Sequence, residues 1–234
     1  MSKTTLYLIP VNLSDDQTDI LPEHALQVVR SLDEFVVENE KSARAFLKRI
    51  QSPIPQSSFI FHLLNEHSTP EEQSALSAVL KKGKPIGLMS EAGCPGIADP
   101  GSELVRMAHE QNIEVIPFIG PSSIFLGLMG SGLNGQSFVF HGYLPREAAQ
   151  RKNRLKELER DAVKKNQTQI FIETPYRNDQ MLADMLEIFS PETRICIGVN
   201  LTSPKQLLKT RSVMDWKKSI PSLHKHPAVF LLGK

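Results

Sequence analysis

The sequence predicts an α/β protein built from two α/β domains with mainly parallel sheets. Short apolar runs rich in β-branched residues alternate with segments of helical spacing along most of the 234 residues, which is the pattern of βαβ units. The charge changes sign along the chain: residues 1–120 hold 10 Lys and Arg against 16 Asp and Glu, whereas residues 121–234 hold 17 against 10. We therefore predict one domain over residues 1–118 and a second over residues 119–234.

The first domain is expected to alternate five strands with four helices. The helices are predicted from caps and from apolar spacing, with Pro22 in the first turn of one, Thr69 capping another that ends at residue 83, and two more over residues 40–50 and 102–112. The strands are short apolar runs bounded by turn residues, and they cover residues 6–9, 35–37, 59–61, 85–89 and 115–118.

The second domain is predicted to continue the alternation, and its first expected element is a strand at residues 138–140. A long basic helix is expected at residues 146–165, because this segment holds 8 Lys and Arg against 4 acidic residues. Another helix is predicted at residues 179–189. Shorter strands and one helix are expected before the last strand, and the clearer strands cover residues 170–172, 195–199 and 228–232.

The composition is that of an ordinary globular protein and excludes several classes. Charged or strongly polar residues interrupt every apolar run before 18 residues, so no membrane span is expected, and the first residues lack the apolar segment of a signal peptide. Two cysteines without a CxxC pair exclude a disulfide scaffold. No third ligand is evident beside the histidines at 62 and 67 or at 224 and 226, so no metal site is expected. We expect a reduced, cytoplasmic protein.

The least ordinary stretch follows the strand predicted at residues 85–89. Its twelve residues, 90–101, contain three glycines and two prolines, too many for a simple turn between a strand and a helix. Such residues let the backbone approach a ligand closely, and the ligands of open parallel sheets lie outside the carboxyl ends of the strands. We therefore predict a cofactor-sized pocket at this loop, with plain turn formation as the alternative.

Several common motifs are absent. No GxGxxG follows the first strand, and no GxxxxGK[ST], GxSxG or HExxH occurs in the chain, which argues against the usual dinucleotide, triphosphate, hydrolase and metalloprotease sites. Cys94 lies in the glycine-rich loop, but no histidine has a predictable place beside it. We predict that Cys94 lines the pocket, with a role as nucleophile as the alternative.

Four segments carry a resemblance to a known family. They read SEAGCPGIADPG at residues 90–101, IGPS at 119–122, FHGYLP at 140–145 and IETPYR at 172–177. With these segments in this order, the chain resembles the tetrapyrrole methylase family of S-adenosylmethionine (SAM)-dependent methyltransferases. Within that family it resembles the branch that 2′-O-methylates a cytidine of small-subunit ribosomal RNA. The resemblance is strong from residue 6 to about residue 177 and looser to residue 232.

The resemblance implies two α/β domains with SAM in the cleft between them, and a homodimer. Position by position it implies cofactor contacts after the first strand, in the glycine-rich loop, at the start of the second domain and near the last strands. These contacts are Pro10, Leu13, Ser90, Glu91, Ala92, Gly93, Cys94, Ile97, Ala98, Asp99, Ser122, Ser123, Ile124, Ile172, Tyr176, Pro227 and Ala228. Glu91 and Cys94 replace aspartate and threonine of the family, and we expect SAM binding to survive both changes.

Methyl transfer from a sulfonium depends on alignment in a dry cleft more than on a strong base. If the acceptor is a ribose hydroxyl, a side chain at the end of a strand could take its proton, and the candidates are Glu66, Asn65 and His62. Their alternative role is to form helix-cap or loop hydrogen bonds. The three arginines among the expected substrate contacts are predicted to bind phosphates, and their alternative role is an ion pair with an acidic side chain. The expected substrate contacts are Glu38, Arg44, Tyr143, Arg146 and Arg177.

The expected partner is ribosomal RNA or the small ribosomal subunit, and the expected cofactor is SAM. The alternatives are methylation of a tetrapyrrole, a protein or another small molecule, and a SAM-binding protein without catalysis. The last is raised by the segments at residues 38–44 and 62–66, which depart from the pattern of the branch. The small C-terminal domain of many ribosomal-RNA members is expected to be absent after the last strand.

Overall fold

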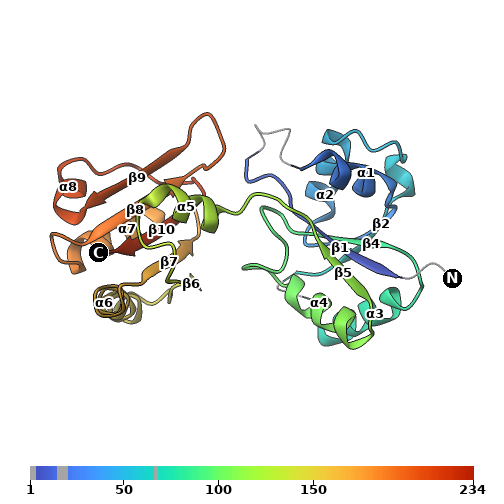
Figure 1. Ribbon diagram of the computed structural model, residues 1–234, viewed down its shortest axis with the longest axis horizontal. Helices are drawn as coiled ribbons and strands as arrows, with labels where there is room; N and C mark the ends of the chain where they lie inside the picture. The colour runs from blue at the N-terminus through green and yellow to red at the C-terminus, as the bar shows by residue number, and fades with distance from the viewer. Residues whose placement is uncertain (1–3, 15–20, 66–67) are drawn as a thin grey trace. The chain divides into compact units, whose positions relative to one another are not determined.

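The fold is described by a computed structural model that covers residues 4–14, 21–65 and 68–234. The chain forms two compact units, Met1–Ser122 and Ser123–Lys234, and their boundary lies a few residues beyond residue 118 (Figure 1). Each unit has a five-stranded sheet with helices packed on both faces. The predicted α/β class is confirmed.

The first unit contains a parallel sheet. Its strands lie in the order β3-β2-β4-β1-β5 and are β1 (Thr5–Ile9), β2 (Glu34–Val37), β3 (Ile60–Leu63), β4 (Ile86–Met89) and β5 (Glu114–Pro117). Its helices are α1 (Glu23–Ser31), α2 (Glu40–Arg49), α3 (Pro70–Leu80) and α4 (Gly101–Glu110), with a short 3₁₀ turn at Gln56–Ser58. Because the strands are parallel, the loops that follow them begin at one edge of the sheet.

Side-chain caps explain where two of these helices begin. The Asn39 side chain accepts hydrogen bonds from the N–H groups of Lys41 and Ser42, at 2.9 and 3.3 Å, at the start of α2. Thr69 and Glu72 form a reciprocal capping box at the start of α3. Pro22 occupies the cap position of α1 rather than its first turn.

Two apolar cores hold the first sheet between its helices. Helices α1 and α2 cover one face of the sheet, and α3 and α4 cover the other (Figure 1). Phe46 of α2 packs in the first core, and Leu80 of α3 and Leu104 of α4 pack in the second. The strands are apolar on both faces because both are covered.

The second unit contains a mixed sheet. Its strands lie in the order β6-β7-β10-β8-β9 and are β6 (Phe138–Tyr143), β7 (Thr168–Glu173), β8 (Arg194–Val199), β9 (Leu207–Ser212) and β10 (Ala228–Gly233). Its helices are α5 (Ser123–Ser131), α6 (Ala148–Lys165), α7 (Asn178–Ile188) and α8 (Val213–Lys218). Strands β6 and β7 pair in parallel, whereas the β7–β10, β10–β8 and β8–β9 pairs are antiparallel.

The prediction of parallel strands therefore does not extend to this second sheet. Residues 200–206 join β8 to β9, and so short a connection cannot make the crossover that parallel neighbours need. Strand β10 enters between β7 and β8 and runs opposite to both. The sequence pattern does not reveal these directions, since an apolar run buried on both faces looks the same in either arrangement.

Helix α5 is the main element that the sequence patterns did not predict. Its residues, SIFLGLMGS, are apolar almost all round, so no helical periodicity marks it. Ile124 and Leu128 pack against the sheet, whereas Phe125 and Met129 are 50% and 81% exposed. Helices α6, α7 and α8 cover the opposite face of the sheet.

A buried ion pair joins α6 to α7. Arg151 Nε lies 2.7 Å from Asp184 Oδ2, and the two side chains are only 7% and 2% exposed. Gln180 donates a hydrogen bond to the other carboxylate oxygen at 2.9 Å, and Arg151 Nη1 donates to the carbonyl of Arg146 at 2.8 Å. Both charges are thus compensated by close partners, as burial requires.

Candidate functional site

Residues 90–101, which we call the β4 loop, are tied to the segment that follows β1. A backbone bridge joins Val11 and Gly93, with N–H···O distances of 2.9 and 3.1 Å in the two directions. The Ser90 hydroxyl lies 3.4 Å from the carbonyl oxygens of Ala92 and Gly93. The Leu13 side chain also lies against Gly93. Two of the predicted cofactor segments therefore meet at the carboxyl edge of the first sheet.

Asp99 fixes the second half of the β4 loop. Its Oδ1 accepts hydrogen bonds from the N–H groups of Gly96 and Gly101, at 2.7 and 2.8 Å, and Gly101 is the first residue of α4. Gly93 and Gly96 have φ values of 79° and 80°, a backbone conformation that favours glycine. The loop therefore has a shape set by its own bonds, which limits the ordering that a ligand must impose.

The segment after β5 closes on the same site. Cys94 Sγ lies 3.3 Å from the carbonyl oxygen of Pro121, and Gly120 packs directly against the Pro10 ring. Burial raises the pKa of the Cys94 thiol, and the nearby Asp99 carboxylate raises it further. A thiol that stays protonated is a poor nucleophile, so this environment favours the predicted lining role for Cys94.

Three carboxylates lie in or beside the β4 loop, and two of them, Glu91 and Asp99, belong to it. Glu38 follows β2 directly and accepts a hydrogen bond from the Glu91 N–H at 3.1 Å. Burial raises the pKa of Glu38, as do the Asp99 and Glu91 charges, against the lowering effect of the Glu91 N–H. Burial also raises the pKa of Asp99. Glu38, expected among the substrate contacts, thus joins a negatively charged site that suits a cationic ligand group.

A cavity of about 280 Å³, which we call the α2 cavity, opens beside the β4 loop. Its walls come from the segment after β1, from α2 and its cap residue, and from the start of the β4 loop: Val11, Asn12, Asn39, Lys41, Ser42, Ala43, Ala45, Phe46, Arg49, Ser90 and Glu91. The sequence patterns did not single out Lys41 or Arg49. Their place follows from the strand order, which sets β2 beside β4.

Two of the predicted phosphate-binding arginines are engaged in ion pairs. Arg44 pairs with Glu40 at 2.7 Å, also donates to the Gln56 carbonyl, and lies 4.7 Å from the centre of the Phe61 ring. Arg44 does not line the α2 cavity. Arg177 of the second unit pairs with the buried carboxylate of Glu173, with Nε 3.0 Å from Oε1. These contacts match the ion-pair alternative.

The other two predicted substrate residues are exposed in the second unit. The Tyr143 side chain is 56% exposed at the end of β6. Arg146 is exposed just before α6, and its backbone carbonyl accepts the bond from Arg151. Their role at RNA stays a prediction.

The candidate proton acceptors stand at the end of β3, two strands away from β4. At an interstrand spacing of about 4.8 Å this is a separation of roughly 10 Å. His62 Nε2 lies 2.8 Å from Glu34 Oε1 on the neighbouring strand β2. The Asn65 N–H donates to Ser68 Oγ at 3.0 Å, and Glu66 lies outside the described residues. Their catalytic role also stays a prediction.

Glu34, the partner of His62, gives the first unit a pH-dependent contribution to stability. Its side chain is 3% exposed, and Lys82 Nζ lies 3.1 Å from the same oxygen that His62 contacts. Burial alone would raise its pKa, but the bonds from His62 and Lys82 hold the pKa of Glu34 below its usual 4.5. A carboxyl whose pKa is lower in the folded state stabilises the fold above the usual value and loses this contribution as the pH falls.

We expect Glu34→Gln to remove that pH dependence while lowering stability at neutral pH, because Gln keeps the shape without the charge. Urea unfolding of both proteins at pH 7 and at about pH 3, well below the ordinary carboxyl pKa, measures the difference. The difference in the free energy of unfolding between the wild-type protein and Glu34→Gln should be smaller at the lower pH. A gap that stays constant between the two conditions would contradict the assignment.

The remaining predicted cofactor contacts lie at or near the second unit. Ser122 is buried at the end of the first unit, Ser123 begins α5, and Ile124 is 8% exposed in the core of the second unit. A further four gather at one end of the second sheet, at the end of β7 and the start of β10: Ile172, Tyr176, Pro227 and Ala228. The Tyr176 side chain is 71% exposed and contacts the His224 ring at a centroid distance of 5.9 Å.

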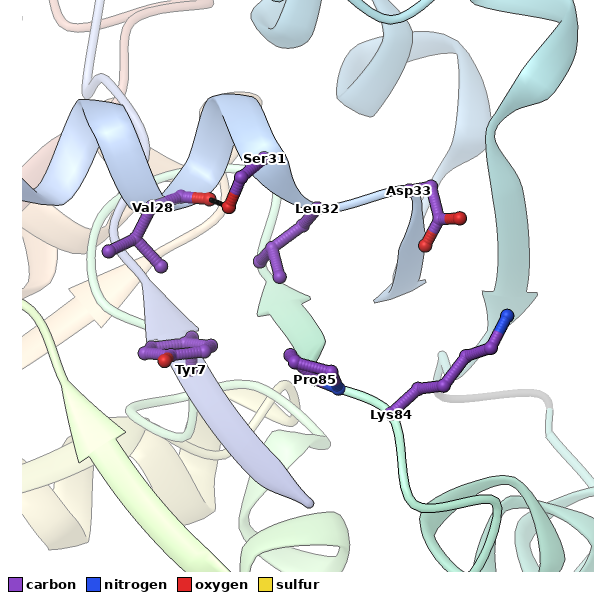
Figure 2. Close-up of a pocket in the computed structure, with 7 residues that line it drawn as sticks. All are labelled: Tyr7, Val28, Ser31, Leu32, Asp33, Lys84 and Pro85. Atoms are coloured by element: carbon purple, nitrogen blue, oxygen red, sulfur yellow. Dashed lines mark hydrogen bonds between the residues drawn. The ribbon is translucent and has the colours of Figure 1, made fainter. Parts of the chain in front are cut away.

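A second cavity, of about 300 Å³, lies at the opposite edge of the first sheet. Figure 2 shows its lining side chains, with Tyr7 and Pro85 on one side and Asp33 and Lys84 on the other. Asp33 and Pro85 immediately precede β2 and β4, so this cavity faces the amino ends of the strands. We assign it no part in the site, because ligands of open α/β sheets lie outside the carboxyl ends.

Two features are absent from the residues that the structure describes. Among them, no group of three or more His, Cys, Asp or Glu side chains is placed to hold a metal ion. Within residues 4–14, 21–65 and 68–234, no helix combines the length and the apolar character needed to cross a membrane.

Comparison with known sequences gives a family match and named relatives. The model of the Tetrapyrrole (Corrin/Porphyrin) Methylases matches residues 6–214. Ribosomal RNA small subunit methyltransferase I of Vibrio cholerae is 32% identical over 200 residues, which are 84% of this chain and 65% of that protein. Proteins of the same name from Pseudomonas aeruginosa and Synechocystis sp. are 29% and 33% identical, covering 100% and 84% of this chain and 80% and 67% of their own lengths. The chain thus spans about two thirds of the first relative.

Comparison with solved structures supports the fold. The crystal structure of the methyltransferase CobJ matches with a TM-score of 0.64, covering 100% of this chain and 95% of that one. Sequence identity between the two is 15%, so this likeness concerns the fold alone.

Proposed function

The chain belongs to the tetrapyrrole (corrin/porphyrin) methylase family, and from that membership we propose that it is a SAM-dependent methyltransferase that 2′-O-methylates a ribose of small-subunit ribosomal RNA. The relatives named Ribosomal RNA small subunit methyltransferase I support the choice of acceptor. The observation that carries the proposal is the β4 loop, which is bridged to the segment after β1 and braced by Asp99.

The residues around the β4 loop fit SAM by charge and shape. SAM carries a sulfonium and an ammonium group, and Glu38, Glu91 and Asp99 give the loop negative charge to attract both. Gly93 and Gly96 leave the backbone open to close approach. We propose that Pro10, Leu13 and the β4 loop hold the cofactor, which when bound supplies a methyl group on a positively charged sulfur.

Alignment is the main contribution that we propose for the protein. Positive charge on the sulfur disperses during transfer, so a positioned acceptor and the exclusion of water lower the barrier more than a strong base does. The β4 loop, fixed by its own hydrogen bonds, offers a preformed surface for this alignment.

A proton acceptor for the ribose hydroxyl is proposed among Glu66, Asn65 and His62. The Glu34 carboxylate accepts a hydrogen bond from the Nε2–H of His62, so in the neutral ring the other nitrogen, Nδ1, carries the lone pair that can take a proton. Glu34 acts here as a positioning residue, since it sets the tautomer without touching the acceptor.

Transfer of labelled methyl from SAM to small ribosomal subunits tests the proposed function. The subunits come from a strain that lacks the gene, and free RNA and subunits from the intact strain are the controls. Label confined to the ribose of RNA in the deletion-strain subunits is the expected result. If SAM binds by calorimetry but nothing is labelled, the protein binds SAM without this activity. Label on a ribosomal protein would show that a protein, and not the RNA, is the acceptor.

Glu91→Arg is expected to weaken SAM binding about ten-fold or more, equivalent to roughly 1.4 kcal/mol. The new guanidinium would repel the positively charged sulfonium and ammonium groups of SAM. Calorimetry measures the affinity. Glu114→Arg is the matched control, since Glu114 is exposed at the start of β5, on the opposite edge of the same sheet. Equal affinities in the two variants would remove the β4 loop from the cofactor site.

We further propose that each unit is one domain and that the protein acts as a cytoplasmic homodimer. Exposed apolar side chains of the second unit support association: Phe125 and Met129 of α5, and Phe138, whose ring lies 6.1 Å from that of Phe125. Sedimentation equilibrium would give twice the chain mass of 26.2 kDa.

A further inference from the structure

We propose that the α2 cavity receives the acceptor nucleotide of a single-stranded RNA segment, with Lys41 and Arg49 at its phosphates. This inference rests on the proposed function and assigns the substrate to a place in the first unit. Ser90 and Glu91, which begin the proposed cofactor loop, also form part of the cavity wall. A nucleotide bound there would lie directly beside the methyl donor.

The lining of the α2 cavity suits one nucleotide in its chemistry. The buried side chains of Val11 and Phe46 give an apolar part for a base or a sugar. Asn12 and Asn39 add amide groups, and Ser90 adds a hydroxyl, which are the groups that recognise base edges and ribose oxygens. Lys41 and Arg49 add the cations that phosphates require.

Charge separates this cavity from the cofactor loop. Glu38 lies beside the loop and Asp99 lies within it, and neither lines the cavity, whose wall holds the single loop carboxylate Glu91 and two cations from α2. A sulfonium or ammonium group would be repelled by Lys41 and Arg49, while a phosphate would be repelled by the carboxylates. The cations at α2 therefore favour a phosphate at that side of the cavity, and Glu91 marks the side where the cavity meets the proposed cofactor loop.

The size of the cavity limits what enters it. Its volume of about 280 Å³ is just below the range for small-molecule pockets, roughly 300–1,000 Å³. That space suits one nucleotide rather than a duplex. Enzymes that modify a nucleotide take it from single-stranded substrate or turn it out of its stack into such a pocket.

Helix α2 provides a matched control for this inference. Lys48 lies on the same helix as Lys41 and is exposed, but it does not line the cavity. The two lysines differ in place and not in charge or length. Removal of either lysine changes the net charge of the protein equally. A difference in KM between the two variants would therefore come from the position of Lys41 in the cavity wall.

The test compares Lys41→Ala with Lys48→Ala in methyl transfer to deletion-strain small subunits. We expect Lys41→Ala to raise KM for the subunits about ten-fold, the effect of one lost charged hydrogen bond, with SAM affinity unchanged by calorimetry. The salt dependence of its KM should weaken by about one phosphate contact. Lys48→Ala should keep the wild-type KM.

A binding measurement tests the same cavity without turnover. Saturation-transfer NMR is measured with two probes, cytidine 5′-monophosphate and cytidine, which lacks the phosphate. Both probes should contact the wild-type protein, and Lys41→Ala should weaken the contact of cytidine 5′-monophosphate only.

Equal KM values for the two lysine variants, with normal transfer by the wild type, would overturn the inference and leave the proposed function intact. Loss of SAM binding in Lys41→Ala would assign the cavity to the cofactor instead. Absence of transfer by the wild type would contradict the proposed function, while the NMR result would still decide whether the cavity binds a nucleotide.

Discussion

Gly120→Ala is expected to reduce SAM affinity about 10- to 100-fold, because one added methyl group forces two ligand-binding segments apart. A Cβ at Gly120 would lie 2.1 Å from Pro10 Cβ and 2.5 Å from Pro10 Cγ. Both atoms belong to a rigid ring immediately after β1, so the ring cannot turn aside as a flexible side chain would. Overpacking of this kind costs roughly 1–3 kcal/mol unless the backbone of one of the two segments shifts to relieve the clash.

Calorimetry with SAM measures this effect, and circular dichroism shows whether the variant keeps its fold. Gly135→Ala is the control, since a Cβ at Gly135 has nothing within 4 Å. A Gly120→Ala protein that binds SAM as tightly as the wild type would show that the segment after β5 does not help to shape the site.

Asp184→Ala is expected to destabilise the protein by about 3–5 kcal/mol, because it leaves the Arg151 guanidinium buried without its counter-charge. The two side chains are 7% and 2% exposed, and both nitrogens that face Asp184 lie 2.7 Å from Oδ2.

Urea unfolding at neutral pH measures the loss, and two further variants separate its cause. Lys152→Ala breaks the exposed pair with Glu187 on the same two helices and should cost at most about 1 kcal/mol. Arg151→Met combined with Asp184→Leu removes both charges and should recover most of the stability. If the double variant is as unstable as Asp184→Ala, packing rather than charge explains the loss.

Local signals predicted much of the fold. The span of α2 could be predicted because Ala43, Phe46 and Leu47 repeat at helical spacing, and the structure adds the Asn39 cap at its start. The start of α3 could be predicted from its Thr69 cap for the same reason. Helix α5 could not, since its apolar residues leave no polar face to set a period.

Contacts between distant segments account for what the sequence did not predict in the site. The glycines and prolines of the β4 loop marked it as unusual on their own, but the meeting of Glu38 with Glu91 depends on β2 lying beside β4. Strand order is a property of the whole sheet, and no short segment encodes it. Because the sequence does not reveal the strand order, Lys41 and Arg49, which line the α2 cavity, were not among the predicted site residues. Arg44 was among them, although its side chain packs on Phe61.

The position of β10 has a consequence for the order in which the molecule is made. All five strands of the first sheet have been synthesised by residue 117, so that sheet can assemble while the rest of the chain is still being translated. The second sheet is different, because β10 lies at its centre, between β7 and β8, and is the last of its strands to be synthesised. Until residues 228–233 leave the ribosome, β7 and β8 have no partner between them, although the helices that cover the two faces of the sheet have already been synthesised. The second sheet therefore cannot be completed until its final strand has been translated, and until then the inner edges of β7 and β8 are open to pairing with other chains.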